Sequence, residues 1–260
     1  MTYLKVAVKA AKKAGEIHKK YFNKGFKVKT KTSSFDLLTV ADTESEKAIV
    51  SIIKKYFPEH NILAEEYKYE KTKSEYTWII DPLDGTNNFA SGLPIFCASV
   101  ALARNDEVIA GVVYDVSRNE LFYAQKNKGA FLNGKRIHVA GIKNLKRALL
   151  ITGFYYSRGD EMIQTLNTIK RFFLKRIMGL RRLGAAALDL CYIACGRASG
   201  FWEFELSPWD FAAGKLLVEE AGGKVSGKNA EKVPLKKKYY IVASNGKIHR
   251  QMLETINVEK

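Results

Sequence analysis

Cysteine is scarce in this chain of 260 residues, which contains only Cys97, Cys191 and Cys195. An odd number of cysteines without metal-ligand spacing argues against both a disulfide framework and a zinc site. Cys191 and Cys195 are separated by one helical turn, as two core positions on the same helix face would be. We therefore expect all three thiols to be reduced and buried.

Long apolar runs are also absent. No run approaches the roughly 20 residues that a membrane-spanning helix needs. The N-terminal segment carries lysine throughout and lacks the apolar core of a secretory signal peptide. We therefore expect a cytoplasmic protein with no membrane partner. Hydrophobic residues make up 47% of the chain and charged residues 27%, a composition typical of a globular protein rather than a disordered one.

Acidic residues are outnumbered, with 43 Lys and Arg against 27 Asp and Glu, so the formal net charge is +16. Such a charge suits a polyanionic partner or an anionic substrate. The basic residues are spread along the whole chain, without an arginine-rich tail or a basic stripe interleaved with aromatics. This favours a lysine-rich solvated surface, and nucleic acid is the less favoured partner.

The first half of the chain predicts two helices followed by an antiparallel meander. Apolar residues recur at helical spacing over 3–23 and again between Asp42 and Pro58. Asn133-Gly134, between short apolar runs, predicts a hairpin turn. The segments with strand patterns are 61–64, 77–80, 97–103, 107–114, 121–124 and 130–137.

Strand and helix patterns alternate in the second half, which predicts an α/β arrangement. Ser207 and Pro208 favour a helix start, and Gly222-Gly223 a helix end. We place a boundary near 141–146, giving an N-terminal α+β domain over 1–143 and a C-terminal α/β domain over 144–260. The other predicted elements are strands over 148–152, 200–204 and 239–243, helices over 160–173 and 185–194, and a final helix.

Two aspartates, Asp81 and Asp84, follow directly on an apolar strand that ends Trp78-Ile79-Ile80. Charge at the end of a buried strand is costly unless it is paired or binds a metal, and Mg²⁺ prefers such oxygen ligands. Gly85 would let backbone approach a ligand, and the amides of Gly85 and Thr86 would favour an anion if a helical turn begins there. A plain surface turn is the alternative.

Two further acids lie at the ends of predicted elements. Glu65 follows the apolar run Ile62-Leu63-Ala64, and Asp210 falls in the first turn of a helix. Singly, they could be a solvated loop acid and a residue that favours a helix start. Together with Asp81 and Asp84 they indicate a multi-metal phosphate site.

The chain resembles the inositol monophosphatase family of Mg²⁺-dependent, lithium-sensitive phosphatases. The motifs that carry the resemblance occur in family order over about residues 31–223. One departure is Ala64, where the family usually has glycine. The two long motifs are the stretch from Trp78 to Phe89 and Pro208-Trp209-Asp210 with the glycines that follow, joined by Ala64-Glu65-Glu66 and by shorter matches at 36–42, 128–134 and 182–190.

The resemblance implies a five-layered α-β-α-β-α sandwich of the inositol monophosphatase and fructose-1,6-bisphosphatase type, of α+β and α/β class, usually as a homodimer. It also implies two or three Mg²⁺ ions per active site. By similarity, Glu65, Asp81 and the Leu83 carbonyl would hold the first ion, and Asp81, Asp84 and Asp210 the second. A third, weaker ion would lie near Glu65.

The implied activity is Mg²⁺-dependent hydrolysis of myo-inositol 1-phosphate and related sugar-alcohol phosphates, by in-line attack of a metal-bound water. Asp42 and Thr86 would take or relay the proton of that water, with Glu65 beside them, and Gly85 and Thr86 would contact the phosphate. Asp42 also precedes an apolar helix, so a simple N-cap role is the alternative.

The implied substrate pocket is formed by Glu203, Asp84 and backbone around Gly184, Ala185 and Ala186. Glu203 would accept hydrogen bonds from inositol hydroxyls; the alternative is an outward-facing acid on an edge strand. Lys31 and Arg158 are further basic candidates, and the lysine-rich segment 24–34 could be a mobile loop. Competing functions are a fructose-1,6-bisphosphatase, a histidinol or nucleotide phosphatase, and a transcription- or RNA-associated binding role.

Overall fold

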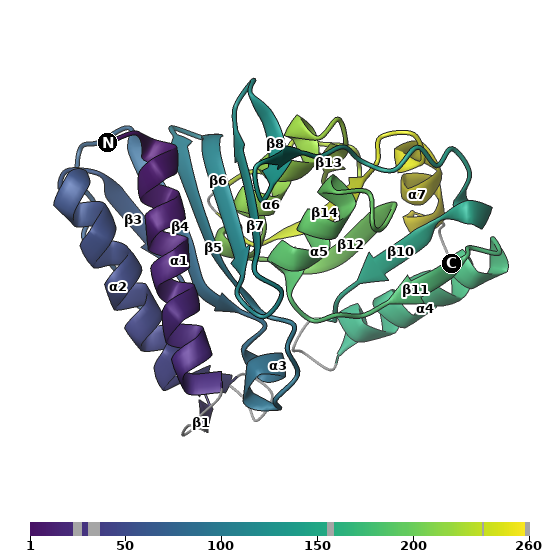
Figure 1. Cartoon of the computed structure of the whole chain (residues 1–260). Helices are drawn as coiled ribbons and strands as arrows, with labels where there is room; N and C mark the ends of the chain where they lie inside the picture. Colours follow the sequence, from purple (N-terminus) through teal and green to yellow (C-terminus); the bar gives the residue numbers. More distant parts are fainter. Residues whose placement is uncertain (23–27, 31–36, 155–158, 236, 258–260) are drawn as a thin grey trace.

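The computed structural model describes residues 1–22, 28–30, 37–154, 159–235 and 237–257. Two sheets and three helix layers alternate in the order α-β-α-β-α (Figure 1). α1 (Tyr3–Phe22) and α2 (Val40–Tyr56) form the first layer, α5 (Ala186–Ala194) and α6 (Pro208–Glu220) lie between the sheets, and α4 (Asp160–Leu174) and α7 (His249–Ile256) form the last. This is the predicted five-layered sandwich.

A seven-stranded sheet separates the first two helix layers. Successive side chains of β4 point to opposite faces of the sheet, and both faces are buried. Trp78 and Ile80 pack with α1 and α2, whereas Ile79 packs with α5 and α6. Its strands, in spatial order, are β3 (Asn61–Ala64), β4 (Tyr76–Asp84), β5 (Cys97–Arg104), β6 (Glu107–Asp115), β7 (Glu120–Gln125), β8 (Gly129–Leu132) and β9 (Lys135–Arg136).

Two predictions for this sheet need correction. β3 pairs parallel to β4, so the meander is antiparallel only from β4 onward. The strand predicted over 130–137 is two strands, β8 and β9, which meet at the predicted turn Asn133-Gly134. Both residues of that turn have positive φ, as a tight hairpin requires.

The second sheet is mixed rather than purely parallel. Strand β12 is central, parallel to β10 and antiparallel to β14. Phe201 of β12 faces the middle helices, while Trp202 packs against Phe172 of α4. The strands in spatial order are β11 (Gly179–Arg181), β10 (Leu149–Thr152), β12 (Gly200–Leu206), β14 (Tyr239–Ser244) and β13 (Lys224–Ser226); β11 and β13 were not predicted.

Short elements complete the described chain. They are β1 (Val28–Thr30) and β2 (Leu37–Thr39), which pair with each other, the helical turn α3 (Thr86–Ala90) and the 3₁₀ turn η1 (Leu145–Arg147). All three cysteines are free, but Cys195 is only half-buried because it ends α5. No helix in the described ranges is long and apolar enough to cross a membrane.

The predicted division at 143/144 falls between β9 and η1, in the connection between the two sheets. The second half nevertheless contributes to the core of the first, because α6 packs on β6 so closely that Gly111 has no room for a side chain. Two separately folded domains therefore stay a prediction.

Candidate active site

The first part of the site is an irregular end of β4. Asp81 and Asp84 are three residues apart, so in a regular strand their side chains would point to opposite faces of the sheet. The pairing of β4 with β5 shifts register between these two residues. The shift lets both aspartates line one cavity.

This cavity has a volume of about 300 Å³ and lies where both sheets meet the middle helices. Glu65 reaches it from the end of β3, and Asp210 from the first turn of α6. The predicted site residues that line it are Glu65, Asp81, Leu83, Asp84, Gly85, Thr86, Gly184, Ala186, Glu203 and Asp210. Residues distant in sequence are thus brought together at one place.

Three aspartates near or in the cavity each hold the start of a helix. Asp42 accepts the Thr39 backbone N–H at 2.7 Å and closes a capping box on α2. Asp210 does the same for α6 through the Ser207 N–H at 2.7 Å. Asp84 accepts the Ala187 N–H of α5 at 2.7 Å from across the site. The positive ends of three helices therefore point toward the acids.

Burial and mutual repulsion disturb the charges of these acids. Burial is the main cause that raises the pKa of Asp84 to about 7; the hydrogen bond from Ala187 opposes the rise and the nearby Glu65 adds to it. Burial also raises the pKa of Asp210 well above its usual value, with Glu65 and Asp84 adding to the effect. Carboxylates this crowded are stabilised in their charged form by a cation.

The donor set fits a hard cation. All candidate ligands are oxygens, which Mg²⁺ prefers, and that ion keeps several waters, so it does not need a closed protein cage. Asp81 is already oriented, since its Oδ1 accepts the Leu83 N–H at 3.0 Å. Among the described residues, no three acidic, histidine or cysteine side chains enclose an ion by themselves. The acids surround the cavity instead.

Thr86 connects the cavity to Asp42. The Thr86 hydroxyl lies 2.9 Å from Asp42 Oδ1 and 2.9 Å from the Leu83 carbonyl oxygen, so its single proton can go to either acceptor. Asp42 itself is fully buried and does not line the cavity. Burial raises the pKa of Asp42 to about 6, with bonds from Thr39 opposing the shift. Its position suits a buried proton acceptor behind Thr86.

The suggestion that Asp42 is an N-cap is wrong in detail. Thr39 is the N-cap of α2, and Asp42 occupies the third helical position, where its carboxylate bonds back to Thr39. The cap uses Oδ2, which leaves Oδ1 to Thr86. One side chain therefore serves both the helix and the site.

Gly85 makes a sharp turn between β4 and α3. Its φ of +91° is in the left-handed region, and a Cβ there would lie 2.7 Å from the Ile95 carbonyl oxygen. A side chain at this position would be strained and would collide with backbone. A helical turn does begin at Thr86, as the anion-binding hypothesis for the Gly85 and Thr86 amides requires.

Glu203 lies on a central strand, so the alternative of an edge-strand acid is wrong. Its carboxyl group covers Gly153, where any Cβ would overlap it. Burial raises the pKa of Glu203 to about 8, Arg182 lowers it, and Asp84 raises it. A half-buried acid of this kind can exchange hydrogen bonds with hydroxyl groups of a bound molecule.

Some predicted residues lie elsewhere. Ala185 is buried behind the cavity, next to the position that a Gly85 side chain would take, and does not line it. Its exclusion follows from its place as the residue before α5, turned into the core. Lys31, Arg158 and the segment 24–34 fall outside the described residues or largely so.

Comparison with known proteins gives the same family from sequence and from structure. The model of the Inositol monophosphatase family matches residues 1–259. The chain belongs to the inositol monophosphatase family. It is 40% identical over 259 residues to an inositol-1-monophosphatase of Synechocystis, covering 98% of this chain and 88% of that protein. It is an inositol-1-monophosphatase-like phosphatase.

Relatives with a different name are equally similar. The Nus factor SuhB of Pseudomonas aeruginosa is 41% identical over 261 residues, covering 97% of this chain and 95% of that protein. The crystal structure of the extragenic suppressor protein suhB from Bartonella henselae has a TM-score of 0.93 and 36% identity, covering 98% of both chains. The layered fold is thus that of the inositol monophosphatase family.

Several residues of the site were missed from sequence. Gly153, Arg182 and Lys238 line the cavity, although the basic residues of the chain were expected mainly on a solvated surface. His18 of α1 was not among the predicted site residues, and its Nε2 lies 2.8 Å from the carbonyl oxygen of Pro82, between Asp81 and Leu83. Gly153 directly after a strand was the one signal available in sequence.

Proposed function

We propose that this family member is a Mg²⁺-dependent phosphate monoester hydrolase acting on myo-inositol 1-phosphate and related sugar-alcohol phosphates. The observation that carries the proposal is the convergence of Glu65, Asp81, Asp84 and Asp210 on one small cavity beside Glu203. Carboxylates supply the charge that a divalent cation needs, and Glu203 supplies an acceptor for a polyol.

We assign the metal ligands as implied by the family resemblance, with two or three Mg²⁺ ions held by Glu65, Asp81, the Leu83 carbonyl, Asp84 and Asp210. When bound, the ions neutralise the phosphate charge and activate water for in-line displacement. Thr86 contacts the cavity and passes a proton to Asp42 through its 2.9 Å hydrogen bond. The amides of Gly85 and Thr86 bind phosphate oxygens at the start of α3.

The leaving alcohol lies against Glu203, Gly184 and Ala186 in this proposal, where Asp84 can also accept from a hydroxyl. Arg182 faces Glu203 and holds it toward its charged state, in which the carboxylate accepts from two neighbouring hydroxyls. A cavity of about 300 Å³ suits one small ring with its phosphate.

The test is phosphate release from myo-inositol 1-phosphate and fructose 1,6-bisphosphate with Mg²⁺, with EDTA, and with Mg²⁺ plus Li⁺. Metal-dependent, lithium-sensitive turnover that strongly favours the inositol ester supports the proposal. Comparable turnover of both esters indicates a broad sugar phosphatase, and no turnover of either by folded protein refutes it. Histidinol phosphate and a 3′-phosphonucleotide complete the substrate panel.

We further propose a cytoplasmic homodimer. Large apolar side chains are exposed along α4 and the turn after it, namely Ile163, Leu166, Phe173, Leu174 and Met178. An apolar stripe of this size on a helix suits burial against a second copy of the chain. The three free cysteines suit a reducing compartment.

A transcription-associated role is the second candidate, favoured by the relatives named Nus factor SuhB and by the net charge of +16. Salt-dependent retention of an Asp81→Asn variant on RNA or on RNA polymerase would support it. Loss of retention together with turnover in that variant would argue against a separate role.

A further inference from the structure

His18 is a buried histidine that the proposed mechanism does not use. It lies near the end of α1, in the first helix layer, and its ring is fully buried. Phe89 and Phe96 meet the ring edge to face, with ring centroids 6.1 and 5.9 Å from that of His18. In such apolar surroundings an imidazole costs free energy unless its nitrogens are hydrogen-bonded. Its presence therefore calls for a reason other than packing.

The hydrogen bond of His18 reaches the irregular end of β4. Nε2 lies 2.8 Å from the Pro82 carbonyl oxygen, whereas Nδ1 has no hydrogen-bond partner among the described residues. A carbonyl oxygen can only accept, so Nε2 carries the proton and donates it. Burial lowers the pKa of His18 to about 4, so the ring is neutral at neutral pH and has only this one proton.

The peptide that accepts this bond is held from both sides. The Pro82 carbonyl and the Leu83 N–H belong to one planar peptide unit. That N–H donates to Asp81 Oδ1 at 3.0 Å. A hydrogen bond to the carbonyl polarises the peptide and strengthens the bond that its N–H donates. The imidazole of His18 is therefore connected to the Asp81 carboxylate through a single peptide group.

Two of the proposed metal ligands flank this peptide unit. In the proposed function, Asp81 and the Leu83 carbonyl both hold the first ion. The Leu83 carbonyl also accepts from the Thr86 hydroxyl at 2.9 Å. Rotation of the peptide between Pro82 and Leu83 would turn both ligands away from their present positions. Mg²⁺ demands near-ideal octahedral geometry at short distances, so its affinity is sensitive to such a rotation.

We propose that His18 is a positioning residue for the metal site, which sets the affinity for the first Mg²⁺ ion by holding the Pro82 carbonyl through its Nε2–H. The inference rests on the proposed metal-dependent function. His18 does not line the cavity and reaches the ligands only through backbone. Its loss should therefore weaken ion binding and leave the rate at saturating Mg²⁺ nearly unchanged.

Calorimetric titration of the full-length, metal-free protein with Mg²⁺ tests the proposal. His18→Leu keeps a side chain of similar size but removes the donor, so the Mg²⁺ dissociation constant should rise at least about tenfold. His18→Gln places an amide N–H near the position of Nε2 and should retain most of the affinity. In phosphate release, His18→Leu should need more Mg²⁺ for its half-maximal rate and regain most of kcat at saturation.

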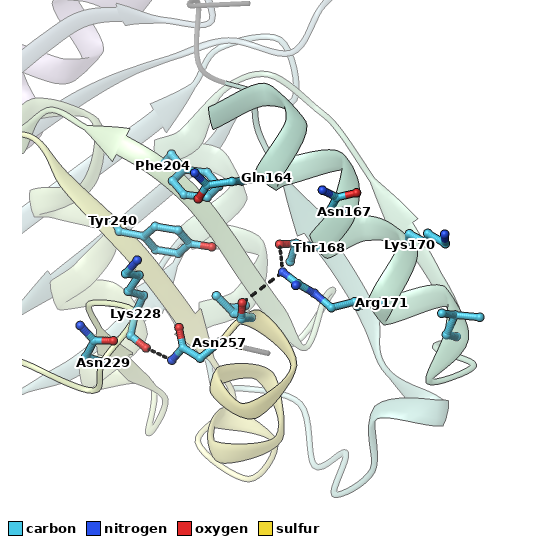
Figure 2. Close-up of a pocket in the computed structure, with 12 residues that line it drawn as sticks. Gln164, Asn167, Thr168, Lys170, Arg171, Phe204, Lys228, Asn229, Tyr240 and Asn257 are labelled. Atoms are coloured by element: carbon cyan, nitrogen blue, oxygen red, sulfur yellow. Dashed lines mark hydrogen bonds between the residues drawn. The ribbon is translucent and has the colours of Figure 1, made fainter. Parts of the chain in front are cut away.

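Two control variants separate this effect from a general loss of stability. His249 of α7 is a second buried imidazole, hydrogen-bonded to Ser226 and Ser244 away from the candidate active site. Asn257 donates its amide to the Lys228 carbonyl at 2.6 Å, beside a separate cavity of about 770 Å³ between α4 and the end of α7 (Figure 2). His249→Leu and Asn257→Leu should each leave the Mg²⁺ affinity within about twofold.

Nitrogen NMR of the unchanged protein, labelled at its histidines, adds a readout that does not depend on any variant. The His18 ring, identified by its contacts with Phe89 and Phe96, should show the neutral tautomer protonated at Nε2. Its Nε2 signal should shift when Mg²⁺ binds, because the ion draws on the same connected hydrogen bonds through Asp81. The signals of His249 should not shift.

Three results would each overturn the proposal while the unchanged protein still binds Mg²⁺ and hydrolyses its ester. They are equal Mg²⁺ affinity in His18→Leu and the unchanged protein, a loss no larger than that in the control variants, and a His18 signal that does not respond to Mg²⁺. Failure of the unchanged protein to bind Mg²⁺ would instead refute the proposed function, and this inference with it.

Discussion

At the scale of single residues, Asp84 both accepts a hydrogen bond from the start of α5 and lines the candidate metal site, and one substitution can separate these two roles. Asp84→Asn keeps an oxygen for the Ala187 N–H and removes a charge that burial and Glu65 oppose. We expect kcat/KM for the preferred phosphate ester to fall at least about a hundredfold, because a metal ligand is weakened. We expect the melting temperature in EDTA to be unchanged or higher. A variant that lost stability in EDTA would show that the charge itself holds the fold.

Asp189 of α5 predicts a pH dependence of stability. Both its carboxyl oxygens are buried without a hydrogen-bond partner in the described structure, and burial, then Glu203 and Asp84, raise its pKa well above the usual value. The folded state keeps a proton that the unfolded state releases above about pH 4. The free energy of unfolding therefore falls as pH rises, by about 1.4 kcal/mol per pH unit, until the folded-state pKa is reached.

Asp189→Asn should remove this loss of stability at higher pH, because the amide has no proton to release in the unfolded state. In EDTA the variant should be more stable than the unchanged protein at pH 8, and the gain should shrink toward pH 4.5. Urea unfolding at several pH values measures it, with the exposed Asp160→Asn as control. A gain that does not vary with pH would mean that packing, not protonation, sets the effect.

Gly153 predicts substrate selectivity. A methyl group there would overlap the Glu203 carboxyl, so Gly153→Ala should displace Glu203 without touching the metal ligands. We expect KM for myo-inositol 1-phosphate to rise about tenfold or more, since hydrogen bonds between Glu203 and the polyol hydroxyls are lost. Turnover of p-nitrophenyl phosphate, which has no polyol hydroxyl, should change far less; an equal loss on both would place the damage elsewhere.

At the scale of elements, the contact between β6 and α6 sets the position of Asp210. A Cβ on Gly111 would lie 3.0 Å from both the Cα and the carbonyl oxygen of Ala213. Gly111→Ala should therefore push α6 outward, lowering stability by about 1–3 kcal/mol and reducing activity at saturating Mg²⁺. Gly141→Ala, at an open position, is the matched control in urea unfolding and phosphate release. Full activity in a destabilised Gly111→Ala would mean that Asp210 tolerates the shift.

Local sequence patterns predicted most of the long helices and strands, because the residues within such an element largely determine whether it forms. Alternation located β4 to β7, and Ser207 with Pro208 located the start of α6. The parallel pairing of β3, the short edge strands β11 and β13, and the register shift between Asp81 and Asp84 depend on partners far along the chain. No local pattern encodes them.

The same distinction holds within the site. The acids that line the cavity could be named in advance, because acids at the ends of apolar runs are conspicuous. Ala185 was expected to line the pocket with Gly184 and Ala186 but is buried behind it. It directly precedes α5, where burial changes from one residue to the next. His18 was missed because only the fold brings α1 against Pro82. Its buried ring donates to that carbonyl and so supports the loop that carries Asp81.

At the scale of the whole molecule, the apolar stripe on α4 predicts self-association. Phe173 is 52% exposed and Met178 65% exposed, and such large apolar side chains gathered along one helix suit burial against a second copy of the chain. Phe173→Glu should shift sedimentation from dimer to monomer at micromolar concentration, because the charge would be buried without a partner. Lys175→Gln, with the same charge change on a residue that is already polar, should leave the dimer intact. A monomeric parent protein would refute the proposed homodimer.

Asp42, Asp84 and Asp210 each accept a hydrogen bond from the backbone at the start of a helix. This affects how the function of a relative should be judged from its sequence alone. Because each of these aspartates holds a helix, a relative that had abandoned hydrolysis for another role would still be under pressure to keep them. Their presence in a genome sequence is then weak evidence for an enzyme. Glu65 follows strand β3 and holds none of these three helix starts, so its replacement would be an earlier and cleaner sign that a lineage had given up the reaction.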